Sequence, residues 1–178
     1  PGRMNVYAEH PFKVILDYGH NAHAVGMMTD LMQRMDVSNR KMVVLAAPGD
    51  RRDEDIRVIA DVVSGKYDVY VLKRDDGLRG RDGDEVPRML AERLKVNGVP
   101  EAAIHVIPDE QQAIDAALNM AEAGDLLLVF GDALARCWKQ ITKFNPDGEV
   151  ANQVVVKKQV ADSNAAMASW LNQNNDSS

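Results

Sequence analysis

Cysteine and aromatic residues are scarce in this chain, and long apolar runs are absent from it. One cysteine, Cys137, among 178 residues excludes an internal disulfide framework and a metal cluster held by several cysteines. Aromatic residues make up only 5% of the chain, so the core must consist mainly of aliphatic residues and methionine. No apolar run reaches the roughly 18 residues that a membrane span needs, and no signal-peptide pattern occurs at the start. We therefore expect a cytoplasmic protein with no membrane partner.

Two common glycine motifs for phosphate binding are also missing. The sequence contains neither Gly-x-Gly-x-x-Gly nor Gly-x-x-x-x-Gly-Lys-Ser/Thr. The first absence disfavours a nicotinamide oxidoreductase, and the second means that a bound nucleotide would need phosphate contacts from other polypeptide. The four histidines are scattered without metal-ligand spacing, so we expect no metal site. The net charge of -6 argues against a nucleic-acid partner, because such binding depends on Lys and Arg neutralising phosphates.

Strand-like and helix-like patterns alternate along the sequence. Five short apolar runs with strand character occupy residues 14–16, 42–46, 69–72, 104–107 and 126–130. Apolar residues at helical spacing lie between them, as at Ile56, Ile59 and Val63. Five successive βα units predict an α/β fold with a Rossmann-like, mostly parallel sheet of five strands and helices on both faces. Residues 4–9 and 13–17 would pair as a hairpin and add one antiparallel edge strand.

Polar residues follow the first apolar run at positions 17–21, which read Asp-Tyr-Gly-His-Asn. Open α/β sheets bind their ligands at the carboxyl ends of the strands. Asp17 at such an end can accept hydrogen bonds from ribose hydroxyls, while His20 and Asn21 can contact a phosphate or a base. A structural role is equally open, in which Asp17 caps the following helix and His20 fills a turn.

A second polar loop, residues 46–55, follows the next run and reads Ala-Ala-Pro-Gly-Asp-Arg-Arg-Asp-Glu-Asp. Asp50 or Asp53 could cap the helix that starts there. Arg51 and Arg52 oppose the positive end of that helix, so they indicate an anionic ligand such as a phosphate or a carboxylate. The alternative is a solvated loop with weak Arg–Asp pairs.

The third polar loop, residues 73–83, is rich in glycine and contains Arg79 and Arg81. A loop of this kind can surround an anion, or it can be a mobile, solvated segment. Since the carboxyl ends of parallel strands meet at one edge of a sheet, all three loops are predicted to form a single site.

The fourth and fifth strand ends carry weaker signals. Pro108 and Asp109 predict only a helix cap. Residues 130–132, Phe-Gly-Asp, repeat the strand-glycine-acid pattern, and Asp132 is as good a helix cap as a ligand. Cys137 falls on an apolar helix face, where a buried and inert thiol is expected.

The character of the sequence changes near residue 145. Asn-Pro-Asp-Gly at 145–148 is a turn signal, residues 154–156 could hold a strand, and the last six residues have a disordered composition. We therefore predict one domain over residues 1–144 and a partly disordered C-terminal extension over 145–178. The opening Pro-Gly-Arg further suggests that residue 1 is a domain boundary within a longer protein.

Several of these segments, in this order, resemble the C-terminal domain of the Mur ligase superfamily over about residues 1–144. The resemblance rests on Pro-Gly-Arg-Met at 1–4, Asp-Tyr-Gly-His-Asn at 17–21 and Gly-Asp-Arg at 49–51. The cyanophycin synthetase branch is most similar, through Pro-Gly-Asp-Arg-Arg-Asp-Glu-Asp at 48–55, Leu-Arg-Gly-Arg at 78–81 and Cys-Trp-Lys-Gln at 137–140.

The resemblance implies an ATP-dependent amide ligase, in which a carboxylate becomes an acyl-phosphate that the amine of an amino acid attacks. A central ATP-binding domain of the same full-length chain would hold most of the ATP and Mg²⁺ contacts, and the C-terminal domain would close over it. In the cyanophycin synthetase branch, the Mur-like half adds arginine to the aspartate side-chain carboxylate of a polymer. A fragment without the P-loop domain would be inactive, and the full-length enzyme could form a homo-oligomer.

Residue roles follow from the same resemblance. The implied nucleotide-binding residues are Arg3 at the phosphates, Asp17 at the ribose, and His20 and Asn21 near the nucleotide. The implied substrate-binding residues, near the incoming amino acid, are Asp50, Arg51, Arg79 and Arg81. No catalytic residue is assigned. Two alternatives stay open, a Mur ligase homologue that joins a different carboxylate and amine, and a stand-alone α/β binding module with a degenerate site.

Overall fold

The computed structural model describes residues 4–77 and 79–146. The chain divides into two units, Pro1–Phe144 and Asn145–Ser178, and the fold is that of the first unit. Its strands are β1 (Asn5–Tyr7), β2 (Lys13–Asp17), β3 (Lys41–Leu45), β4 (Val69–Leu72), β5 (Ile104–Val106) and β6 (Leu126–Phe130). Its α-helices are α1 (Ala22–Arg34), α2 (Asp53–Val63), α3 (Glu85–Val96), α4 (Glu110–Met120) and α5 (Leu134–Lys143), with a 3₁₀ turn at Glu101–Ala103. The possible strand at 154–156 lies outside the described residues.

All six strands form one sheet in the order β1-β2-β6-β3-β4-β5. Five of them run parallel, and β1 pairs with β2 in the antiparallel direction, with Val6 opposite Ile15. The last strand within the described residues, β6, therefore lies between β2 and β3. The predicted α/β architecture, a mostly parallel Rossmann-like sheet with one antiparallel edge strand, is confirmed.

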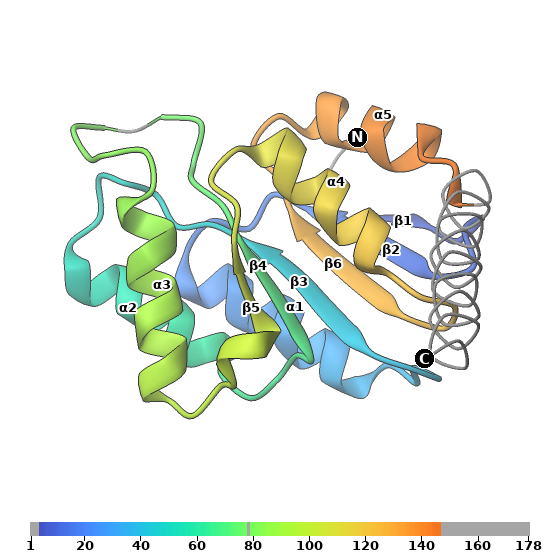
Figure 1. Cartoon of the computed structure of the whole chain (residues 1–178), viewed down its shortest axis with the longest axis horizontal. Coiled ribbons are helices and arrows are strands. Elements are labelled where there is room, and N and C mark those ends of the chain that lie inside the picture. The colour runs from blue at the N-terminus through green and yellow to red at the C-terminus, as the bar shows by residue number, and fades with distance from the viewer. Residues whose placement is uncertain (1–3, 78, 147–178) are drawn as a thin grey trace, which may run out of the picture. The chain divides into compact units, whose positions relative to one another are not determined.

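Helices cover both faces of the sheet (Figure 1). Helices α1, α2 and α3 pack on one face, and α4 and α5 pack on the other. Side chains of β6 alternate between the two layers, as a strand buried on both faces requires. Leu126, Leu128 and Phe130 belong to the first layer, whereas Leu127 and Val129 belong to the second.

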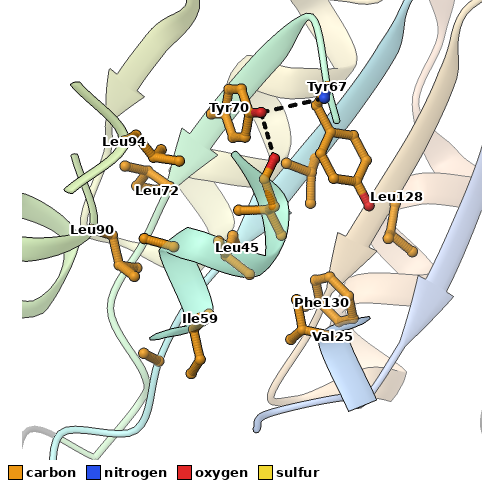
Figure 2. Close-up of a cluster of buried hydrophobic side chains, with 14 of the residues drawn as sticks. Val25, Leu45, Ile59, Tyr67, Tyr70, Leu72, Leu90, Leu94, Leu128 and Phe130 are labelled. Atoms are coloured by element: carbon orange, nitrogen blue, oxygen red, sulfur yellow. Dashed lines mark hydrogen bonds between the residues drawn. The ribbon is translucent and has the colours of Figure 1, made fainter. Parts of the chain in front are cut away.

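The core beneath α1, α2 and α3 is mainly aliphatic, as the shortage of aromatic residues predicts, and its tyrosines have hydrogen-bond partners (Figure 2). The Tyr70 hydroxyl donates to the Val63 carbonyl at 2.6 Å and accepts from the Tyr67 amide at 3.3 Å. The Tyr67 hydroxyl lies 2.9 Å from Thr29 Oγ1. Burial raises the pKa of both tyrosines, so they stay neutral in the core.

The starts of α1 and α2 show that the capping residues offered by the sequence, Asp17, Asp50 and Asp53, are not the ones used. Asn21, and not Asp17, caps α1, because Asn21 Oδ1 accepts from the Ala24 amide at 2.8 Å. Neither Asp50 nor Asp53 caps α2, since the residue before the helix is Arg52 and Asp53 lies in the first turn. There the carboxylate still favours the positive end of the helix.

Helices α4 and α5 begin in different ways. Asp109 caps α4 as predicted, with its Oδ2 accepting from the Gln112 amide at 3.0 Å. Ala133 precedes α5, so Asp132 is not the residue that caps it. Within residues 4–77 and 79–146 the longest helix, α1, has 13 residues, and no helix there meets the length and apolarity that a membrane span requires.

Candidate functional site

The carboxyl edge of the sheet has the geometry of a ligand crevice. The chain leaves β2 and β3 toward α1 and α2 on one face, and it leaves β6, which lies between them, toward α5 on the opposite face. Loops that diverge from neighbouring strands open a crevice at the strand ends. The loops after β3 and β4 extend beside each other beyond this edge (Figure 1).

A cavity of about 260 Å³ occupies this crevice, and four loops contribute to it. Its lining residues are Tyr18 and His20 after β2, Pro48, Asp50 and Arg51 after β3, Asp75 and Arg79 after β4, and Asp132 after β6. The structure thus brings together four of the residues singled out in the sequence, His20, Asp50, Arg51 and Arg79. It adds Asp75 and Asp132, so that the wall carries charges of both signs.

Arg79 and Asp50 form an ion pair across the mouth of the cavity. Arg79 Nη1 lies 2.7 Å from Asp50 Oδ2, and both side chains are about half exposed, at 54% and 48%. Arg79 also has a positive φ of 51°, an uncommon conformation for a residue other than glycine. Because the pair is exposed, its net stabilisation is small, and an anionic ligand could take the place of the Asp50 carboxylate.

Arg81 lies behind the β3 loop and is not among the residues that line the cavity. Its Nε donates to the Gly49 carbonyl at 2.8 Å, and its Nη2 donates to the Arg51 carbonyl at 2.8 Å and to Asp53 Oδ1 at 2.9 Å. The Nη1 atom donates to Glu85 Oε1 at 3.1 Å. The planar guanidinium thus joins the loop after β4 to the loop after β3 and fixes the backbone that carries Arg51.

A second pocket, of about 450 Å³, lies next to the first, and Tyr18 and His20 line both. Its other lining residues are Met4, Asp17, Gly19, Asn21, His23, Ala24, Met27 and Met28. The buried Asp17 carboxylate accepts from the Met4 amide at 3.0 Å and the Gly19 amide at 2.9 Å. The size and the methionine-rich wall fit a nucleoside, but the described wall carries no lysine or arginine for a triphosphate. Arg3 lies outside the described residues.

A buried charge cluster behind the first cavity gave only a faint sequence signal. Lys73, which directly follows β4, is 0% exposed, and its Nζ lies 2.9 Å from Glu110 Oε2 and 3.8 Å from Asp132 Oδ2. Glu110 is the first residue of α4 and its side chain is 1% exposed. A lysine that continues an apolar run is the feature that could have pointed to this cluster, since lysine is rarely buried without a partner.

The protonation states in the cluster follow from burial and from Lys73. Burial alone would raise the pKa of Glu110, but the Lys73 ammonium and hydrogen bonds outweigh it and lower that pKa to about 2. Burial raises the pKa of Asp132 to about 6 despite the nearby Lys73, and Asp75 adds to the rise. Burial and the hydrogen bond to Glu110 raise the pKa of Cys137 to about 12, so this buried thiol stays protonated.

Carboxylate oxygens of Asp76, Glu110 and Asp132 lie within 4.8 Å of one another, a spacing that a metal ion could use. The Lys73 ammonium lies against two of the three groups and already supplies a positive charge there. These side chains therefore have a charge partner within the protein.

The model of the family described as "Mur ligase, glutamate ligase domain" matches residues 2–133. A cyanophycin synthetase from Nostoc sp. is 34% identical over 148 residues, which cover 79% of this chain and 15% of the relative. The cyanophycin synthetase from Geminocystis herdmanii is 30% identical over 149 residues, covering 84% of this chain and 17% of the relative. The chain thus spans about a sixth of the length of these relatives.

Solved structures show the same architecture. E. coli FolC in complex with ADP superimposes with a TM-score of 0.61 and 27% identity, covering 80% of this chain and 31% of that one. A UDP-N-acetylmuramoyl-L-alanyl-D-glutamate–2,6-diaminopimelate ligase superimposes with a TM-score of 0.56 and 24% identity, covering 72% of this chain and 26% of that one. The family match and the sequence relatives together show that this chain belongs to the Mur ligase family, through its glutamate ligase domain.

Proposed function

We propose that this chain is the C-terminal domain of an ATP-dependent amide ligase, and that residues 1–144 form that domain. The observation that carries the proposal is the pairing of two adjoining pockets at one sheet edge, one of nucleoside size and one lined by charges of both signs. The names of the relatives support it, since they are synthetases and ligases.

The second pocket would take part of the ATP. Asp17 would accept a hydrogen bond from the ribose through the lone pairs that its two backbone contacts leave free. His20 and Asn21 would lie near the nucleotide, and Arg3 would reach the phosphates. The central domain of the full-length chain would hold Mg²⁺ and most of the phosphate contacts. The ADP complex of the FolC relative supports a nucleotide beside this fold.

The first cavity would take the incoming amino acid. An amino acid carries a carboxylate and an ammonium group, and this cavity offers guanidinium groups on Arg51 and Arg79 and carboxylates on Asp75 and Asp132. Asp50 and Arg81 would hold the loops that present these arginines.

We further propose that the amino acid is arginine, which adds to the aspartate side-chain carboxylate of a polymer through an acyl-phosphate. The similarity to cyanophycin synthetases supports this choice. Asp75 and Asp132 in the cavity wall, which unlike Asp50 do not pair with Arg79, also suit a substrate with a cationic side chain. The 178-residue chain alone would be inactive, because closure over the central domain would complete the site. The full-length enzyme would be cytoplasmic, and it could assemble as a homo-oligomer.

The direct test is ADP release by the full-length enzyme with ATP, Mg²⁺, an aspartate-bearing acceptor and single amino acids. Release that depends on both the acceptor and arginine supports the proposal. Release with another amino acid or acceptor would instead indicate a Mur ligase homologue of different specificity. No release with any pair, with a nucleotide still bound by the intact chain, would favour a binding module with a degenerate site.

Two substitutions separate the pockets in that enzyme. Asp17→Ala should raise the KM for ATP, because the variant loses a carboxylate that would bind the ribose. Arg51→Ala should raise the KM for the amino acid more than the KM for ATP. An unchanged ATP constant in the first variant, or equal losses in the second, would remove that residue from its assigned pocket.

A further inference from the structure

We propose that Lys73 and Glu110, neither of which lines the amino-acid cavity, are positioning residues that hold the Asp132 carboxylate in the cavity wall. The proposal rests on the function proposed above, and it assigns a role to a buried ion pair that needs no contact with the substrate. Its consequence is that amino-acid binding depends on charges that no ligand touches.

Glu110 joins three parts of the molecule through one carboxylate. Its Oε2 lies 2.9 Å from Lys73 Nζ and accepts from the Asp132 amide at 2.9 Å. Its Oε1 accepts from Arg136 Nη2 at 2.6 Å and from Cys137 Sγ at 3.1 Å. A side chain from α4 therefore fixes the end of β4, the loop after β6 and the first turns of α5.

Lys73 acts through its positive charge and not through a directional hydrogen bond. Its Nζ is buried and, among the described residues, has no aligned hydrogen-bond partner, although it lies 2.9 Å from Glu110 Oε2 and 3.8 Å from Asp132 Oδ2. An ammonium in a dry site attracts both carboxylates strongly. Lys73 thereby favours the ionised form of Asp132, which burial opposes.

Asp132 is the member of the cluster that reaches the cavity. Its side chain is 21% exposed, against 0% for Lys73 and 1% for Glu110. Its Oδ2 accepts from the Asp76 amide at 2.8 Å, which ties the loop after β6 to the loop after β4. The titratable and charged groups around Asp132 are Lys73 at the end of β4, Asp75 and Asp76 in the following loop, Glu110 on α4, and Arg136 and Cys137 on α5.

The location of the pair argues for positioning over stability alone. Apolar residues of similar volume can replace a buried ion pair with little loss of stability. A charged pair at this place, however, sets both the backbone of Asp132 and the ionisation of its carboxylate. The pair Arg40–Asp125, at 2.8 Å on the amino edge, offers a matched control with a buried carboxylate and no contact with the cavity.

The first experiment uses the 178-residue chain and needs no activity. Carboxyl carbon resonances followed by NMR against pH should give Asp132 a pKa near 6, above its ordinary value of 3.8, because burial disfavours the carboxylate. Lys73→Met should move that pKa upward, and Arg40→Met should leave it unchanged. A pKa of Asp132 that does not respond to Lys73→Met would overturn the proposal.

The second experiment uses the full-length ligase with Lys73→Met and Glu110→Gln combined, so that no lone charge is left in the core. We expect the KM for the amino acid to rise at least about tenfold while the KM for ATP stays unchanged, because only the wall of one cavity moves. In the single variant Lys73→Met, which removes only the positive charge, the acid limb of the kcat/KM profile for the amino acid should also move to higher pH. A variant that melts like the parent and keeps the parental KM and pH profile would overturn the proposal.

The two experiments separate this proposal from the one it rests on. A full-length enzyme without ligase activity would reject the proposed function, while the Asp132 titration would still decide whether Lys73 controls that carboxylate. Arg40→Met in the ligase should lower the melting temperature without moving the pH profile. The same displacement of the profile in Arg40→Met would show a general effect of lost stability and would count against Lys73 and Glu110 as positioning residues.

Discussion

The dipeptide Gly-Asp occurs at both ends of the central strand β6, and its two copies have different environments. Gly124 and Asp125 precede the strand, and Gly131 and Asp132 follow it. The Asp125 carboxylate accepts from the backbone amides of Arg40 and Glu122 at 2.9 and 2.8 Å, and Arg40 Nη2 lies 2.8 Å away. The hydrogen-bonding capacity of Asp125 is therefore used within the protein, and its role is structural.

The Asp132 carboxylate accepts fewer hydrogen bonds than that of Asp125, and burial destabilises its charged form. In the described part of the chain, the Asp76 amide is the backbone donor to its carboxylate, at 2.8 Å, and Lys73 Nζ stays 3.8 Å away. Burial consequently raises its pKa to about 6, and part of the carboxylate faces the cavity. The comparison teaches that an acidic side chain at a sheet edge can bind a ligand when the protein leaves part of its hydrogen-bonding capacity unused.

The largest contrast should come from removing the two buried carboxylates that anchor the edges. Glu110→Ala leaves Lys73 buried without its partner and should lower the free energy of unfolding by about 3–5 kcal/mol. Asp125→Ala should cost about 2–3 kcal/mol, because it removes charge-assisted hydrogen bonds but leaves Arg40, 31% exposed, able to reach water. Urea unfolding at pH 7 measures both losses. An equal loss in the two variants, or a larger loss in Asp125→Ala, would show that the stability of the carboxyl edge does not depend more on buried charges than that of the amino edge.

Replacing each aspartate of the two dipeptides by asparagine should separate structure from ligand binding. Asp125→Asn should cost about 1.5–3 kcal/mol, since an amide nitrogen would face donors that now reach a carboxylate. Asp132→Asn should change stability by no more than about 0.5 kcal/mol, or increase it, because burial penalises the charged form. Thermal and urea unfolding of both variants give the comparison, and a large loss in Asp132→Asn would make that residue a structural acid too.

Replacing the glycine of each dipeptide by alanine should lower the stability of the protein, for a different reason in each case. In Gly131→Ala the new Cβ would lie 2.9 Å from Cys137 Sγ, a buried atom, and the cost should be about 1–2 kcal/mol. Cys137→Ala should remove at least half of that cost in the double variant. Gly124→Ala should cost about 1–2 kcal/mol from its positive φ of 84° and from crowding of the new Cβ against Ser38 Oγ, with no rescue by Cys137→Ala. A double-mutant cycle on unfolding free energies tests this difference.

The last contrast is a biphasic dependence of stability on pH. The folded pKa of Asp132, about 6, exceeds its ordinary value of 3.8, so its contribution grows as pH falls from 7 toward 4. The folded pKa of Glu110, about 2, lies below its ordinary 4.5, so its contribution is lost as pH falls from about 4.5 toward 2. The difference between the parent and Asp132→Asn, measured by urea unfolding across this range, should change as pH falls from 7 toward 4 and become independent of pH once Asp132 is protonated in both states.

The fold could be predicted because each of its signals is local. Apolar runs bounded by turn residues marked the parallel strands, and helical spacing marked the helices between them. Parallel strands share one carboxyl edge, so the meeting of the loops carrying His20, Asp50, Arg51 and Arg79 also followed from the sequence. The roles of these residues in binding stay predictions.

What the sequence did not reveal depends on which elements become neighbours. Lys73 and Glu110 lie 37 positions apart, and Asp132 lies another 22 away; they meet only because α4 packs beside α5 and β6 is inserted into the middle of the sheet. The sequence also left the cap of α1 open, for a different reason. Asp17 and Asn21 are both good capping residues, and only the observed first residue of the helix, Ala22, selects Asn21.

The place of β6 in the sheet also bears on how the chain assembles. Because β6 follows the other five strands of the described residues yet lies between β2 and β3, those two strands lack their native neighbour until residues 126–130 are available. Until the strand emerges from the ribosome, the apolar sides of its two future neighbours stay open to wrong pairing. Completion of this domain is therefore a late, long-range event in its folding.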